Sequence, residues 1–107
     1  MQKQVVPLLP DQVRAVMDRP SETERGDVRQ FVDWCAFYNL KMPAVAEDVG
    51  EYLFELLEHE YPLRDIKRIA KSIMAYYERR KYFLDRWVVR QAMKLIEAQL
   101  SPDRVLN

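Results

Sequence analysis

The sequence predicts an all-α protein, and three observations support this prediction. Apolar residues recur at intervals of three and four, the spacing of one face of a helix. No segment shows the sustained alternation of apolar and polar residues that a half-buried strand requires. Proline and glycine separate the periodic stretches. We expect one domain over residues 1–107, a small bundle of four to five helices with loose ends at 1–10 and 101–107.

The first two predicted helices lie in the N-terminal third of the chain. A short helix is predicted over residues 11–18, with Asp11 as its N-cap. The second helix begins after Ser21, which has capping-box spacing to Glu24, and ends near Asn39. Its predicted inward positions are Val28, Phe31, Val32, Cys35 and Tyr38.

Three further helices begin after a turn, a proline or a capping residue. The third follows the turn Lys41-Met42-Pro43, the fourth has Pro62 in its first turn, and the fifth is capped by Asp85. The helical pattern breaks between the last two, over residues 78–84. The predicted inward positions are, for the third helix, Val49, Tyr52, Leu53, Leu56 and Leu57; for the fourth, Ile66, Ile69, Ala70, Ile73 and Tyr77; and for the fifth, Val88, Val89, Ala92, Met93, Ile96 and Leu100.

The composition argues against several kinds of catalytic site. With one histidine, His59, and one cysteine, Cys35, there is no zinc-ligand set, so we assign both residues structural roles. Two glycines, Gly26 and Gly50, do not form a phosphate-binding loop, and no serine has a nucleophile-elbow context. We therefore expect a protein that has no enzymatic activity and binds no metal, cofactor or small-molecule substrate. Lacking a long apolar stretch, the chain is expected to be cytoplasmic and free of membrane.

Charge is distributed unevenly, although 17 basic and 17 acidic side chains cancel. Residues 1–60 hold 6 basic and 12 acidic side chains, whereas residues 61–107 hold 11 and 5. The basic residues fall on faces of the fourth and fifth helices and between them, as a nucleic-acid backbone requires. The candidate DNA-binding residues are Arg64, Lys67, Arg68, Lys71, Arg79, Arg80, Lys81, Arg86, Arg90 and Lys94.

Other interpretations of these charges stay open. The basic residues could form a solvated face, or pair with the acidic row of the third helix, namely Glu51, Glu55 and Glu58. Alternatively, the acidic and basic halves could dock with a partner protein, or head to tail with another copy of the chain, without any nucleic acid.

Five aromatic residues lie in or near the basic connector between the fourth and fifth helices. In this setting, aromatic side chains either stack on unpaired bases or anchor a loop in the core. We place Tyr77 in the core, because it shares the face of Ile66 and Ile73, and Trp87 on the polar side of its helix. The five residues are Tyr76, Tyr77, Tyr82, Phe83 and Trp87.

Four motifs follow one another over about residues 21–97. They contain Thr23, Arg25, Asp27, Phe31, Trp34 and Cys35; Pro43, Val49, Tyr52, Leu53 and Leu56; Ile66, Arg68 and Ile73; and Val89, Ala92 and Ile96. In their order and spacing they resemble the core-binding domain of tyrosine recombinases, the module that precedes the catalytic domain in phage-type integrases. The resemblance implies a SAM-like helical fold that contacts duplex DNA through its fourth and fifth helices.

The sequence departs from this family in two respects. Asp65 stands where the family commonly has Thr beside the DNA backbone, and its carboxylate would oppose phosphate contact unless Arg68 or Lys67 neutralises it. The family's catalytic Arg, Lys, His and Tyr would lie downstream of residue 107. We therefore expect a non-catalytic DNA-binding module, whose protein partner would be a recombinase or another copy of itself.

Overall fold

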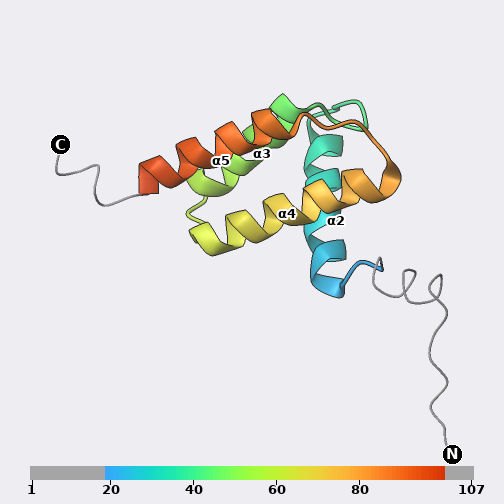
Figure 1. Cartoon of the computed structure of the whole chain (residues 1–107), viewed down its shortest axis with the longest axis horizontal. Coiled ribbons are helices and arrows are strands. Elements are labelled where there is room, and N and C mark those ends of the chain that lie inside the picture. Colours follow the sequence, from blue (N-terminus) through green and yellow to red (C-terminus); the bar gives the residue numbers. More distant parts are fainter. Residues whose placement is uncertain (1–18, 101–107) are drawn as a thin grey trace, which may run out of the picture.

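The computed structural model describes residues 19–100, which hold four α-helices and no strand (Figure 1). The helices are α2 (Glu22–Phe37), α3 (Ala46–Glu58), α4 (Leu63–Arg80) and α5 (Arg86–Leu100). The predicted all-α class and small bundle are confirmed for this part of the chain. The helix predicted over 11–18 and both predicted loose ends lie outside it. None of the described helices is long and apolar enough to span a bilayer.

The helices pack mainly as two pairs. In Figure 1, α2 crosses α4, and α3 runs alongside α5; smaller contacts join α4 to α3 and to α5. The α3–α5 pair is close at Gly50, where an added Cβ would stand 3.3 Å from the Cβ of Ala92. That distance is tighter than ordinary van der Waals contact, so the absence of a side chain at Gly50 permits this approach.

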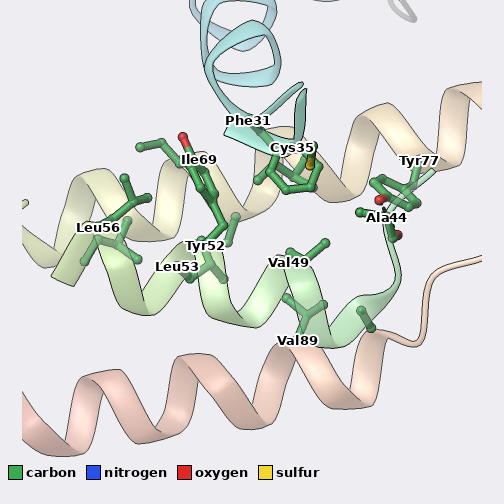
Figure 2. Packing of buried hydrophobic residues seen from close by; sticks show 14 of the residues in the cluster. Phe31, Cys35, Ala44, Val49, Tyr52, Leu53, Leu56, Ile69, Tyr77 and Val89 are labelled. Atoms are coloured by element: carbon green, nitrogen blue, oxygen red, sulfur yellow. Dashed lines mark hydrogen bonds between the residues drawn. The ribbon is translucent and has the colours of Figure 1, made fainter. Parts of the chain in front are cut away.

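All four helices contribute to one core (Figure 2). Phe31 of α2, Leu53 of α3, Ile69 of α4 and Val89 of α5 are each at most 1% exposed. All five predicted inward positions of α4 are buried, and those of α3 are buried or half-buried. The Tyr77 hydroxyl donates a hydrogen bond to a backbone carbonyl of the α2–α3 connection, which confirms its predicted place in the core.

Two predicted inward positions are wrong. Tyr38 is 50% exposed and Leu100 is 44% exposed. Tyr38 caps the C-terminus of α2, and Leu100 is the last residue of α5, so both stand where the apolar stripe runs past the core. The remaining predicted inward positions of α2 and α5 are buried or half-buried.

The starts of α2 and α5 follow the capping residues expected from the sequence. Ser21 Oγ accepts a hydrogen bond from the Glu24 N–H at 3.1 Å, which fixes the first turn of α2. Asp85 Oδ1 accepts from the N–H groups of Trp87 at 3.1 Å and Val88 at 3.4 Å. Pro62 is the N-cap of α4 and lies one residue outside the first turn in which we expected it.

Three helices end in left-handed backbone at residues other than glycine. These residues are Asn39, Glu60 and Lys81, with φ of 58°, 64° and 59°. In each case the following N–H bonds to the carbonyl five residues earlier, in the pattern of the Schellman motif. The residues that follow are half-buried and pack on the core: Leu40, Tyr61 and Tyr82. Burial of the next side chain therefore fixes these ends without glycine.

This ending corrects the predicted break over residues 78–84. Because the left-handed residue is Lys81, α4 continues through Glu78 and ends at Arg80. Arg79 and Arg80 thus belong to the last turn of the helix, not to a connector. Cations are favourable there, because the carbonyl end of a helix carries partial negative charge.

Candidate nucleic-acid interface

The basic face of α4 forms one wall of an open groove. Four of the predicted DNA-binding residues share this wall: Arg64, Lys67, Arg68 and Lys71. Ser21, Thr23 and Glu24, from the N-terminus of α2, line the groove with them, and the Glu24 carboxylate is paired with Arg79. The positive end of the α2 dipole therefore lies beside the same groove. The sequence predicts Ser21 as a helix cap but carries no local signal that this helix start meets the basic face of α4.

All four cations are exposed, and three of them have no ion pair with a buried carboxylate. Arg64 and Lys71 make no ion pair with any residue in the described part of the chain. Lys67 Nζ lies 2.9 Å from Glu97 Oε2 of α5, and both side chains are about half exposed. An exposed ion pair of this kind contributes little stability, so a phosphate can compete for Lys67.

Arg68 is held differently, because it ties α4 to α2. Its Nε and Nη2 donate to Oδ2 and Oδ1 of Asp27, both at 3.1 Å. Asp27 is 6% exposed and also accepts a 2.8 Å hydrogen bond from Ser72 Oγ. The hydrogen bonds to Asp27 raise the pKa of the guanidinium further above its usual value, so Arg68 stays charged. Arg68 therefore acts first as a structural cation at the edge of the groove.

The structure provides a partner for Asp65, the residue that departs from the recombinase pattern. Arg68 Nη1 donates to Asp65 Oδ1 at 3.0 Å. Of the two cations that we considered as neutralising partners, Arg68 is the one in contact. The Arg68 guanidinium thus binds two carboxylates, those of Asp27 and Asp65. The positive charge available in the groove therefore comes from Arg64, Lys67 and Lys71.

The C-terminal end of α4 carries two more predicted site residues. Arg79 forms a two-pronged ion pair with Glu24 of α2, through Nη1 to Oε2 and through Nη2 to Oε1 at 3.0 Å. The Arg80 guanidinium lies over the ring of Tyr76, 5.6 Å from its centroid. Arg79 therefore adds a second tie between α4 and α2.

The last four predicted site residues follow α4. Lys81 is exposed at the helix end, and Arg86 Nη2 lies 3.3 Å from Glu78 Oε1. Arg90 and Lys94 are exposed on α5 and have no ion pair with a described residue. The ten predicted residues therefore do not form one site: four line the groove, and the others lie at the end of α4 and along α5.

The acidic row of α3 does not neutralise these cations as one interpretation suggested. The carboxylates that bind Lys67, Arg68, Arg79 and Arg86 come from α2, α4 and α5. In α3, the carboxylate of Glu55 lies 4.0 Å from Nε2 of the exposed His59. The acidic half of the sequence thus pairs with the basic half through Asp27 and Glu24 of α2, and not through the row on α3.

No known protein family, curated protein or solved structure matches this chain. The resemblance to the recombinase core-binding domain therefore stays a prediction from the motifs over residues 21–97. The basis for a function is the groove itself and the charges around it.

The five aromatic residues near the basic connector fall into two groups. Tyr76, Tyr77 and Tyr82 pack edge to face, with ring centroids 5.8–6.0 Å apart, and anchor the end of α4. Phe83 and Trp87 are 86% and 66% exposed. From the sequence, each of these five residues could either pack in the core or stack on a base. In the structure the three tyrosines pack against one another, and Phe83 and Trp87 are the two whose rings are mostly exposed to an external partner.

Cys35 is a core residue. It is fully buried, and burial, with a smaller effect of Asp48, raises the pKa of its thiol to about 11. The thiol is therefore protonated at neutral pH and is a poor nucleophile. Within residues 19–100, no group of three or more His, Cys, Asp or Glu side chains is placed to hold a metal ion.

Proposed function

We propose that this chain is a non-catalytic DNA-binding module of the kind found as the core-binding domain of tyrosine recombinases, with a SAM-like fold. It would contact duplex DNA through the basic faces of α4 and α5. The observation that supports this proposal best is the groove in which Arg64, Lys67 and Lys71 face the N-terminus of α2.

The geometry of the groove suits a phosphodiester backbone. Residues three and four apart on a helix are neighbours, with Cβ atoms about 5–6 Å apart, so the three cations form a continuous row. Helix N-termini attract phosphate through backbone N–H groups and the dipole. Ser21 and Thr23 add hydroxyl groups on the opposite wall. Contacts of these kinds position a protein on a duplex without reading its sequence.

Arg90 and Lys94 extend the proposed interface onto α5. Both are exposed, and on a helix they are neighbours four residues apart. Arg68 contributes indirectly, because it fixes the angle between α2 and α4 that forms the groove. The proposal thus divides the predicted cations into those that reach DNA and those that hold the helices.

Binding of a short duplex across a salt series tests this proposal. Each phosphate contact contributes about −0.9 to the slope of log affinity against log salt, so three groove contacts predict a slope near −3 or steeper. The readout is fluorescence anisotropy of a labelled duplex. Absence of binding at about 50 mM salt, or a slope near zero, would refute the proposal.

A second candidate function is protein–protein interaction, including self-association. One observation favours it: Phe37, at the end of α2, is 80% exposed, and the neighbouring Tyr38 is half exposed. Exposed aromatic residues next to a charged surface are typical of protein interfaces. Sedimentation equilibrium without DNA tests the self-association form. A mass that rises with concentration at low salt supports it, and a monomer at all concentrations refutes it.

A further inference from the structure

We propose that Phe83 and Trp87 stack on unpaired nucleobases, so that the α4–α5 connection and the outer face of α5 bind a single-stranded stretch of nucleic acid. This inference rests on the proposed function for the class of ligand, but it concerns a different surface. The duplex groove lies between α2 and α4, and neither aromatic residue lines it.

The exposure of Phe83 and Trp87 is unusual for their residue types. Trp and Phe are mostly buried in folded domains, because burial of one such side chain contributes about 2–3 kcal/mol. Here 86% of Phe83 and 66% of Trp87 remain exposed, although three tyrosines within eleven residues of Trp87 are packed. Their rings are therefore accessible to a planar ligand such as a nucleobase.

Four cations lie on the same elements as these rings. Arg90 and Lys94 follow Trp87 at three and seven residues, positions on the same face of α5. Neither has an ion pair with a described residue. Lys81 and Arg86 line a pocket together with Phe83 and Glu78, and Arg86 is paired with Glu78. Aromatic faces for bases, set among cations for phosphates, are the two components of sites that bind single strands.

The charge around the rings selects this ligand over a second protein copy or an apolar peptide. The outer face of α5 near Trp87 carries Arg90 and Lys94, and the flanking carboxylates are already engaged, Asp85 in capping α5 and Glu97 in pairing with Lys67. Phe37 is an equally exposed aromatic residue, but it lies at the end of α2, beside the acidic α3. Among the exposed aromatic residues of the described part of the chain, Phe83 and Trp87 are the ones that lie on the basic elements.

Tryptophan fluorescence tests the stacking directly in the full chain. The difference in emission between the wild type and Trp87→Phe isolates Trp87 from Trp34. The probe is a thymidine oligonucleotide of about 12 nucleotides. We expect it to quench Trp87. We expect Trp87→Ala to weaken its binding by about fivefold or more, with Phe83→Ala in the same direction.

Two variants serve as controls. Trp87→Phe keeps an aromatic ring and should retain most of the affinity that Trp87→Ala loses. Phe37→Ala removes an exposed aromatic residue from the acidic side and should leave oligonucleotide binding unchanged. All of these side chains are exposed, so their variants are expected to unfold at nearly the wild-type temperature.

A blunt duplex and an acidic peptide complete the test. The inference is overturned if Trp87→Ala binds the oligonucleotide as the wild type does, or if the acidic peptide quenches Trp87 and the oligonucleotide does not. Duplex binding, measured in parallel by anisotropy, keeps the two proposals apart. Duplex binding without a role for Trp87 on single strands refutes only this inference, whereas oligonucleotide binding through Trp87 without duplex binding refutes only the duplex groove.

Discussion

Arg68 and Asp27 join α4 to α2 through two parallel hydrogen bonds of 3.1 Å each. Asp27 is nearly buried, whereas the Arg68 side chain is 46% exposed at the edge of the groove. A residue that charge patterning assigns to DNA contact therefore first serves the fold. The cations of α4 therefore have different roles. Arg68 joins two helices, whereas Arg64 and Lys71 have no ion pair with a described residue.

Loss of Arg68 should destabilise the protein. Arg68→Ala leaves the buried carboxylate of Asp27 with Ser72 as its remaining side-chain donor, which should lower the free energy of unfolding by about 2 kcal/mol. Urea unfolding measures this loss. Arg64→Ala, which removes a neighbouring exposed arginine, should change stability by no more than about 0.5 kcal/mol. Equal effects of the two variants would show that the Asp27 pair does not stabilise the fold.

The two glycines should respond in opposite directions to larger side chains. An added Cβ at Gly26 meets no atom within 4 Å, so Gly26→Ala should raise the free energy of unfolding by about 1 kcal/mol through helix propensity. Gly50→Leu should force α3 away from Ala92 and cost about 2 kcal/mol. Thermal unfolding checks both. A Gly50→Leu protein as stable as the wild type would contradict the close packing of α3 and α5.

The left-handed end of α3 can be tested at Glu60. A non-glycine residue in this conformation costs about 1 kcal/mol, so Glu60→Gly should stabilise the protein by up to that amount. Glu51→Gly, at an exposed position in the interior of the same helix, should destabilise it by about 1 kcal/mol. Opposite shifts in the unfolding midpoint are the expected result, and shifts of the same sign would contradict this helix end.

Burial of Cys35 predicts a loss of stability at alkaline pH. Its pKa rises from 9.0 to about 11 in the folded protein, so the unfolded chain releases this proton first. The stabilisation is complete below pH 9 and is lost as the pH approaches 11. From pH 8 to 9.5 the wild type should lose about 1 kcal/mol more than Cys35→Ala. Urea unfolding at the two pH values measures this, and parallel losses would contradict it.

Periodicity and capping residues predicted most of the helical structure. The stripe of α4 is buried, and that of α3 is buried or half-buried, as expected, because regular spacing of apolar residues is a local property. The predicted end of α4 was wrong, because the left-handed residue is Lys81 and the glycine that usually marks a helix end is absent. What fixes that end is the packing of Tyr82, which depends on the whole fold.

The candidate site was harder to predict than the helices. Charge patterning identified the basic face of α4 but could not distinguish Arg68 from Lys71. The carboxylate that binds Arg68 belongs to Asp27, which lies on another helix. A signal for Asp27 was present: it precedes Phe31 by four residues and Cys35 by eight, which places a carboxylate on the apolar stripe of α2. The meeting of the α2 N-terminus with α4 had no local signal.

Removal of two free groove cations tests the duplex proposal most directly. Arg64→Ala/Lys71→Ala removes one arginine and one lysine from the groove, and Arg29→Ala/Lys41→Ala removes the same pair of types from exposed positions outside it. The salt dependence of duplex binding is the measurement. We predict that the groove variant binds at least about tenfold more weakly, with a slope shallower by about 2, while the control matches the wild type. Equal weakening by both variants would contradict the account, because binding would then follow net charge and not the groove.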